Sequence, residues 1–312
     1  MNGLDHPALL YRDVAEFLAA TVPFVECGLA TGEPVMVAVP DANLQRLRAA
    51  LDPADAGAVE WHDMRRAGAN PGRIIPGVLL AFADRHAGKR VRIIGEPIWA
   101  GRTALEYPAC VQHEALINAA FAGRDATILC PYDTARLDPE VIEDAHRTHP
   151  VLQTPDRRWD SADYGDPVHV AAGFNRPLPD PPATAARITI GFASLAATRD
   201  LVLDRALGAG LSPDRADAMV IAVNELATNT VQHTGDIGRL AIWVEAGTLV
   251  CQLSDSGHLT DPLAGRIPPA PTRYGGRGLV LVNQFCDFVR IHTRPGATTI
   301  RLHARLTPPT AR

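Results

Sequence analysis

Three polar side chains recur at every fourth position near the end of the segment 213–233. Glu225, Asn229 and His233 share one face if this segment is helical, and apolar residues fall elsewhere on it. A carboxylate beside a carboxamide suits phosphoryl transfer, because the amide oxygen can bind Mg²⁺ and the carboxylate can orient or deprotonate a hydroxyl. The simpler interpretation is the polar outer face of an amphipathic helix.

A second candidate is Asp255-Ser-Gly257, which follows the apolar segment 249–253. A carboxylate at the end of a strand can accept a hydrogen bond from an exocyclic amine such as that of adenine. The glycine lets the backbone approach a ring closely. The same residues also suit an ordinary turn after a strand.

The third candidate is the stretch 275–278, which reads Gly-Gly-Arg-Gly and precedes an apolar helix. Backbone N–H groups and the dipole at such a helix start can hold phosphate, and Arg277 adds positive charge. A flexible turn is the plainer interpretation. Leu281 stands where the dinucleotide-binding pattern needs a glycine, so that pattern does not apply. The proline-containing stretch 258–274 is predicted to be a short lid over nucleotide, or else a surface loop.

The elements that carry these motifs predict an α+β two-layer sandwich over residues 185–308. Helical periodicity and paired apolar strands are grouped rather than alternating, which favours antiparallel hairpins covered by helices. Strands are predicted at 187–192, 239–245, 249–255, 288–293 and 298–304, and helices at 193–208, 213–233 and from 278 onward.

The three motifs together resemble the N, G1 and G2 boxes of the GHKL ATPase superfamily, and within it the anti-sigma-factor serine kinases. The resemblance covers about residues 185–306. It implies a Bergerat-type, histidine-kinase-like ATPase fold that binds ATP and Mg²⁺, with Asn229 on the metal, Asp255 on adenine and Glu225 as the catalytic base for a protein serine hydroxyl. The implied nucleotide-binding residues are Asn229, His233, Asp255, Gly257, Gly275, Gly276, Arg277, Gly278 and Leu279.

The same resemblance implies partners and a role in transcription regulation. Such family members sequester a sigma factor and phosphorylate its antagonist, a STAS-type anti-anti-sigma protein, on serine, and a homodimer is compatible with this class. Two other functions stay open: a non-catalytic ATP-binding partner switch and a sensor histidine kinase. The upstream histidines for the latter, His146, His149 and His169, lie in or beside a proline-rich stretch without heptads, which argues against it.

Residues 1–153 alternate short apolar strands with helices, which predicts an α/β unit with a mainly parallel sheet covered on both faces. Prolines then crowd 154–184, which is predicted to be a linker or an extended surface arm. Lys89 is followed by Arg90 rather than Ser or Thr, so no P-loop is expected there. Strands are predicted at 34–40, 58–61, 91–94 and 126–130, and helices at 12–20, 42–50, 73–86, 104–122 and from 138 onward.

Four stretches of this first unit resemble the MEDS sensory domain, a degenerate RecA-like unit. They are His6 to Tyr11, Gly95 to Trp99, His113-Glu114 with Asn118, and Cys130 to Asp133. The resemblance implies a small organic ligand, and the residues that could line its site are His6, Tyr11, Glu96, Trp99 and Glu114.

Taken alone, each of these residues has a structural interpretation as well. Tyr11 and Trp99 suit core aromatics, His6 suits the surface, and Glu114 with Asn118 suits a solvated helix face. No two histidines or cysteines show metal-ligand spacing, so a metal site in this unit is not expected.

Composition limits the class of protein. The chain has 312 residues, of which 46% are hydrophobic and 21% charged, with a net charge of −5. These values are typical of soluble globular domains and give no basic field for direct binding to nucleic acid or a membrane. The five cysteines show no paired spacing. Reduced thiols in a cytoplasmic protein are therefore expected.

Overall fold

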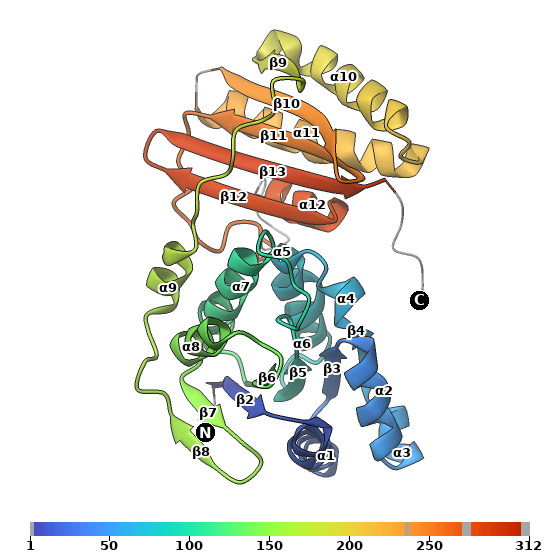
Figure 1. The fold of residues 1–312 in the computed structure, drawn as a ribbon, viewed down its shortest axis with the longest axis vertical. Coiled ribbons are helices and arrows are strands. Elements are labelled where there is room, and N and C mark those ends of the chain that lie inside the picture. The colour runs from blue at the N-terminus through green and yellow to red at the C-terminus, as the bar shows by residue number, and fades with distance from the viewer. Residues whose placement is uncertain (1–2, 235–236, 270–275, 307–312) are drawn as a thin grey trace. The chain divides into compact units, whose positions relative to one another are not determined.

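The computed structural model describes residues 3–234, 237–269 and 276–306 and divides the chain into two compact units (Figure 1). The units are Met1–Phe174 and Asn175–Arg312. Each contains one sheet.

The first unit has the predicted mainly parallel sheet. Its strands lie in the order β4-β3-β5-β6-β2-β7-β8, with β1 pairing onto β6, and the β7–β8 pair is antiparallel while the others are parallel. The first long strand, β2, therefore lies in the interior of the sheet. The strands are β1 Leu4–Asp5, β2 Pro7–Tyr11, β3 Val35–Val39, β4 Glu60–Asp63, β5 Val91–Gly95, β6 Ala126–Asp133, β7 Val151–Gln153 and β8 Arg158–Asp160.

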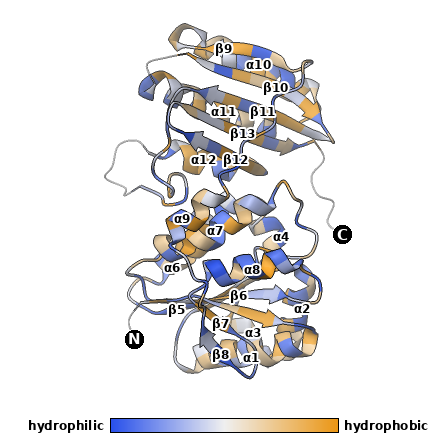
Figure 2. Ribbon diagram, turned by 60° about the vertical axis from the view of Figure 1, so that its left-hand side comes forward, coloured by the Kyte–Doolittle hydropathy of each residue, from blue (hydrophilic) through white to orange (hydrophobic). Residues whose placement is uncertain are grey.

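Helices cover both faces of this sheet. Val35, Val37 and Val39 of β3 pack with α1 and α2 in one core cluster, whereas the equally buried Met36 and Ala38 point to the opposite face. Helix α8 carries both hydrophobic and hydrophilic residues along its length (Figure 2). The helices are α1 Val14–Ala30, α2 Asp41–Ala50, α3 Pro53–Ala58, α4 Met64–Ala67, α5 Pro71–Ile74, the π-helix η1 Ile75–Leu80, α6 Ala81–Arg85, α7 Tyr107–Ala120, α8 Pro139–Thr148 and α9 Pro167–Gly173.

The single helix predicted over 73–86 is instead three consecutive pieces, α5, η1 and α6. Pro76 lies near the start of the π-helical piece. Proline has no backbone N–H to donate to the preceding turn, so the regular α-helical ladder is interrupted there.

The stretch 154–184, predicted as a linker, is partly folded onto the first unit. β8 pairs with β7, and Asp166 caps the start of α9, because its carboxylate accepts a hydrogen bond from the backbone N–H of His169. The first unit therefore extends to Phe174. Prolines concealed these elements, because they disfavour regular structure while still being tolerated at the first turn of a helix.

The second unit has the predicted antiparallel sheet and helical layer. Its strand order is β12-β13-β11-β10-β9, and every pair is antiparallel. Helices α10, α11 and α12 pack on one face in a common core. The elements are β9 Ala186–Ile190, the 3-10 helix η2 Phe192–Ser194, α10 Leu195–Gly208, α11 Pro213–His233, β10 Gly238–Glu245, β11 Thr248–Asp255, α12 Gly278–Phe285, β12 Phe288–Arg294 and β13 Ala297–Arg305.

The segment leading into β9 is held against the strands of the same sheet. Asn175 Nδ2 donates to the carbonyl of Thr293 at 2.6 Å, and Arg301 donates to the carbonyl of Pro179. The Arg301 guanidinium also lies 5.1 Å from the ring centroid of Trp243. The second half of the predicted linker is therefore an extended arm along this unit.

In the part of the chain that the structure describes, no helix has the length and apolar character needed to cross a membrane.

Candidate functional site

Helix α11 positions the first set of predicted site residues. Pro213 occupies its first turn, and Met219, Val223 and Leu226 are buried against the sheet. Glu225 and Asn229 lie one turn apart on the partly exposed side. Among the described residues neither side chain has a hydrogen-bond partner, so both polar groups are available to a ligand.

The start of α12 lies directly against these two side chains. A Cβ atom on Gly278 would be 2.9 Å from Glu225 Oε2 and 3.3 Å from Asn229 Nδ2. Gly276, two residues earlier, has φ +80°, a conformation that side chains rarely adopt. The close approach therefore brings the N–H groups at the start of an eight-residue helix beside a carboxylate and a carboxamide.

Asp255 lies at the end of β11 with a fixed carboxylate. Its Oδ2 accepts a hydrogen bond from Thr230 Oγ1 at 2.6 Å, and its Oδ1 accepts one from the backbone N–H of Gly257 at 2.9 Å. A carboxylate has about four lone-pair positions, so each oxygen can accept a further hydrogen bond. The neighbouring Thr298 hydroxyl donates to the carbonyl of Gly257 at 3.0 Å and holds the turn on the adjacent strand.

A cavity of about 650 Å³ joins these groups. This volume is in the range of sites for ligands of drug or cofactor size. Seven residues of the predicted nucleotide-binding set line it: Asn229, His233, Asp255, Gly257, Gly276, Gly278 and Leu279.

Three predicted residues have other places. Glu225 lies against Gly278 without lining the cavity. Arg277 is exposed at the N-cap of α12. Gly275 lies outside the described residues, as do the last residues of the predicted lid. The described part of that lid, 258–269, contributes residues to the cavity wall, including Leu259, Leu263 and Gly265.

The residues of this cavity are chemically suited to ATP and Mg²⁺, the two groups that the resemblance implies. Gly278 leaves open the space beside Glu225 and Asn229 that a Cβ atom would fill, so a charged ligand can approach the helix start. The Asn229 amide oxygen is a hard donor of the type that Mg²⁺ accepts beside phosphate oxygens. Asp255, Leu253 and Ile300 combine a hydrogen-bond acceptor with apolar surface, as a purine base requires.

The first unit has a second, smaller cavity of about 330 Å³. It lies at the carboxyl ends of β2, β3, β5 and β6, where open parallel sheets usually bind ligands. Three of the five predicted sensor residues line it: Tyr11, Glu96 and Trp99.

Glu96 is a buried acid of this cavity whose pKa is shifted by its surroundings. It is 3% exposed, and its carboxylate accepts hydrogen bonds from Asn43 Nδ2 at 2.9 Å and from the Tyr11 hydroxyl at 3.5 Å. Burial raises the pKa of Glu96 to about 8, and the nearby Asp133 acts in the same direction, while the hydrogen bond from Asn43 opposes it.

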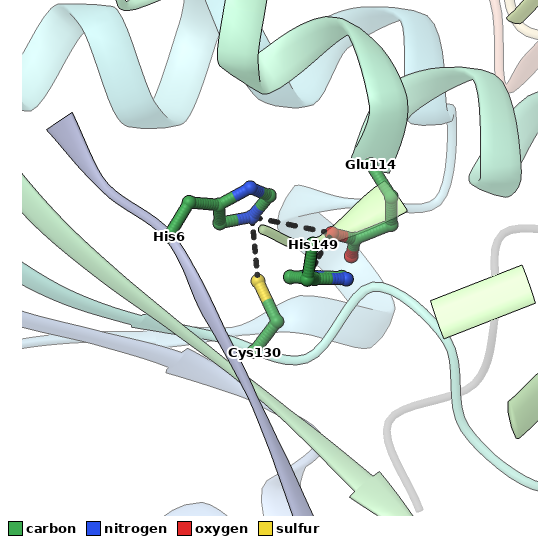
Figure 3. A group of neighbouring side chains, drawn as sticks. All are labelled: His6, Glu114, Cys130 and His149. Carbon is green, nitrogen blue, oxygen red and sulfur yellow. Dashed lines mark hydrogen bonds and ion pairs between the residues drawn. The ribbon is translucent and has the colours of Figure 1, made fainter. Parts of the chain in front are cut away.

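The other two predicted sensor residues lie elsewhere. His6 and Glu114 belong to a separate buried group with Cys130 and His149 (Figure 3). Both His6 and Glu114 are 0% exposed, so the surface interpretation of His6 and the solvated-face interpretation of Glu114 are wrong. The physical reason is that Glu114 lies on a buried face of α7, where its carboxylate faces His6 and His149.

For some residues of the two cavities and of the buried group, the sequence carries no signal. Thr230, which holds Asp255, directly follows Asn229, but its type alone gives no signal of that contact. Asn43 meets Glu96 only because α2 begins where β3 ends. Cys130 and His149 come from β6 and the end of α8, so no local spacing could have paired them.

Comparison with known proteins assigns each unit to a domain family. Residues 5–150 match MEDS, the MEthanogen/methylotroph, DcmR Sensory domain, and residues 192–304 match the Histidine kinase-like ATPase domain. No curated protein matches the sequence. The chain therefore consists of an N-terminal MEDS domain and a C-terminal histidine kinase-like ATPase domain, as the motifs indicate.

Two solved structures show a distant similarity to this chain. The RsbU and RsbW domains of Rv1364c from Mycobacterium tuberculosis are 19% identical over 41% of this chain and 34% of that chain, with a TM-score of 0.32. An ATPase from the type III secretion system of pathogenic bacteria is 11% identical over 76% of this chain and 77% of that chain, with a TM-score of 0.30.

Proposed function

We propose that this chain, a MEDS domain followed by a histidine kinase-like ATPase domain, is an ATP- and Mg²⁺-dependent protein serine kinase of the anti-sigma type. It binds a sigma factor and phosphorylates a STAS-type antagonist protein. The observation that carries the proposal is the contact of Gly278 with Glu225 and Asn229 at one end of a cavity that Asp255 lines.

Each residue has a role that follows from its chemistry. Asn229 would hold Mg²⁺, which would offset the negative charge of the phosphoryl group that ATP supplies. Asp255 accepts a hydrogen bond from the exocyclic amine of adenine. The glycines at the start of α12 leave backbone N–H groups open to phosphate. Glu225 orients the serine hydroxyl of the protein substrate and takes its proton.

A pair of asparagines on α11 gives a matched test of the nucleotide site. Asn229→Ala should weaken binding of ATP with Mg²⁺ at least about tenfold, measured by calorimetry, because the metal loses a ligand. Asn224→Ala is the control, since Asn224 lies on the same helix and instead accepts a hydrogen bond from Arg199 Nη1 at 3.2 Å. Equal loss of affinity in both variants would remove Asn229 from the site.

Glu225→Gln separates catalysis from binding. This variant keeps the size of the side chain but cannot accept a proton, so it should retain ATP affinity and lose phosphate transfer by about 100-fold or more. Labelled ATP and a purified STAS-type protein give the readout. If the wild-type protein transfers no phosphate and still releases the sigma factor normally, a non-catalytic partner switch would be supported instead.

The histidine-kinase alternative has little support in the first unit. His149 is 0% exposed and therefore closed to phosphate donors in this fold. Acid-labile phosphate on His146 or His169 would revive that alternative; acid-stable phosphate on a serine of the antagonist would support the serine kinase.

We also propose that the smaller cavity of the MEDS domain binds the sensed ligand. Its lining combines the polar groups of Tyr11 and Glu96 with the aromatic face of Trp99. It also carries charges of both signs, from Asp13 and Asp133 and from Arg12, Arg46, Arg65 and Arg136. This favours a small polar organic molecule. If the ligand regulates the second domain, ATP affinity should change when the ligand is present, and calorimetry of the full chain measures that coupling.

A further inference from the structure

Four buried side chains converge in the MEDS domain from four separate segments (Figure 3). His6 lies between β1 and β2, Glu114 on α7, Cys130 on β6 and His149 just after α8. Their potential ligand atoms all lie within 4.8 Å of one another. This group is separate from the cavity lined by Tyr11, Glu96 and Trp99.

The proton position on His149 is fixed by its backbone neighbour. His149 Nδ1 lies 2.9 Å from the carbonyl oxygen of Ala145, and a carbonyl can only accept, so Nδ1 carries a hydrogen and donates it. When the ring is neutral, its Nε2 atom therefore carries the lone pair. It lies 3.2 Å from Glu114 Oε2, without the geometry of a hydrogen bond.

The same argument fixes His6. Asn118 Nδ2 donates to the carbonyls of Thr148 at 2.8 Å and Ala115 at 3.2 Å, so its Oδ1 faces His6 Nδ1 at 3.1 Å and accepts a hydrogen from it. In the neutral ring, His6 Nε2 therefore also carries the lone pair. It lies 3.6 Å from Glu114 Oε2, and it lies 3.4 Å from Cys130 Sγ, whose thiol can donate a weak hydrogen bond to it until a metal displaces that proton.

Electron-rich atoms thus face one another in a fully buried space. Both carboxylate oxygens of Glu114 and the Nε2 of His149 lack a hydrogen-bond partner among the described residues. The imidazoles of His6 and His149 that face Glu114 compensate its charge only when they are protonated, and a buried carboxylate without a compensating charge is strongly destabilising. A cation at the centre resolves the conflict.

The geometry points to a metal ion, and we propose that His6 Nε2, Glu114, Cys130 Sγ and His149 Nε2 bind Zn²⁺. Zinc–nitrogen and zinc–oxygen bonds of about 2.0–2.1 Å and a zinc–sulfur bond of about 2.3 Å give tetrahedron edges of about 3.3 Å between light atoms and about 3.6 Å to sulfur. Three of the six ligand–ligand distances in the structure match these edges: the nitrogen–oxygen distances of 3.2 and 3.6 Å and the nitrogen–sulfur distance of 3.4 Å. All six lie within 4.8 Å, so the ion would draw the remaining ligands slightly inward.

Charge and surroundings support the same ion. A divalent cation, one thiolate and one carboxylate sum to zero, which suits a site that is closed to water. Both imidazoles donate their other N–H to an oxygen, which is the usual outer shell of metal-bound histidine. A site with four protein ligands and no exposure is of the structural type, so the ion ties the first strand to β6, α7 and the end of α8.

The metal content of the full-length protein, purified without a histidine tag, tests this directly. Elemental analysis should find about one zinc per chain, and removal by a strong chelator should lower the melting temperature of the MEDS domain, with recovery on adding Zn²⁺ alone. Cobalt substitution should give the intense visible bands of a tetrahedral site and a thiolate charge-transfer band. Protein that folds without any metal and gains no stability from Zn²⁺ would overturn the proposal.

Two cysteine variants make the test specific. Cys130→Ser should lose the thiolate charge-transfer band and bind zinc at least about tenfold more weakly. Cys110→Ser is the matched control, because Cys110 is also buried and lies on α7 outside the group, and it should keep one zinc per chain. If Cys130→Ser does not fold, the cobalt-substituted wild-type protein gives the test: a thiolate charge-transfer band supports a cysteine ligand, and its absence contradicts one. Equal zinc content and an unchanged band in both variants would exclude Cys130 as a ligand.

Discussion

At the residue scale, Gly278 controls access to the two polar side chains of α11. Alanine there would place a Cβ atom 2.9 Å from Glu225 Oε2. Gly278→Ala should therefore weaken ATP binding at least about tenfold, while the better helix propensity of alanine leaves stability unchanged or raises it by up to about 1 kcal/mol. Calorimetry and denaturant unfolding measure the two effects separately.

Gly208→Ala is the control for that variant. Gly208 is also in a helix, α10, and a Cβ atom there would meet nothing within 4 Å. This variant should gain similar helix stability and keep its ATP affinity. Equal affinities in the Gly208 and Gly278 variants would show that the start of α12 does not contact the nucleotide.

Thr230 is predicted to act through Asp255. Thr230→Val keeps the shape of the side chain but removes the hydroxyl that donates to Asp255 Oδ2. We expect a stability loss of about 1 kcal/mol and a three- to tenfold loss of ATP affinity, since the carboxylate becomes free to rotate. Thr230→Ser, which keeps the donor, should restore most of the affinity; failure of both variants alike would point to packing instead.

Glu96 gives the MEDS domain a pH-dependent stability. Between its ordinary pKa of 4.5 and the folded value of about 8, the folded state holds a proton that the unfolded chain has released. The free energy of unfolding therefore falls as pH rises through this window, by roughly 2–5 kcal/mol. The groups that face Glu96 are Tyr11, Asn43, Asp133 and Arg136.

Glu96→Gln should flatten that dependence. Glutamine cannot release a proton, so unfolding measured from pH 5 to pH 8 should show a smaller slope than in the wild-type protein. A slope that is unchanged in the variant would assign the pH dependence to other groups.

At the element scale, the segment 258–269 is docked on α12 through one glycine. Gly265 has φ +74°, and a Cβ atom there would lie 2.7 Å from Leu279 Cβ. Gly265→Ala should displace the segment, raise its sensitivity to proteases and weaken ATP binding. Gly296→Ala is the control, because Gly296 shares a positive φ of +77° but has nothing within 4 Å. If both variants keep wild-type affinity, the segment does not cover the ligand.

The sequence predicted the elements that have strong local signals. The bounds of α11, Pro213–His233, are confirmed, because a proline at the helix start and regular apolar spacing mark it. β2, Pro7–Tyr11, was not predicted as a strand, since a short apolar run beside a proline has no distinctive period. β8 and α9 were hidden by prolines at positions that the folded chain tolerates.

The site residues, like the elements, could be predicted only where the signal is local in the sequence. The residues around the larger cavity could be named because their types and spacing within each motif carry chemistry. The group of His6, Glu114, Cys130 and His149 could not, since each residue lies alone in its segment and only the parallel sheet with its helices brings them together. The expectation that this unit holds no metal site rested on local spacing, which cannot reveal residues that only the fold brings together.

At the scale of the whole molecule, two compact units predict two responses to ligands. Calorimetric unfolding of the full chain should show ATP with Mg²⁺ raising the transition of the ATPase domain, and Zn²⁺ raising that of the MEDS domain. At 100 times the dissociation constant each ligand adds about 2.7 kcal/mol. Variants at Asn229 and Cys130 should each abolish one shift and leave the other; loss of both shifts in either variant would contradict independent sites.

The place of β2 in its sheet sets an order of events during synthesis. β2 leaves the ribosome first among the long strands, yet both of its neighbours, β6 and β7, are made at the end of the domain. Its apolar residues therefore wait with both edges unpaired until almost the whole domain has emerged. A nascent chain stalled before β6 is exposed to aggregation, and chaperone capture should be strongest at those lengths.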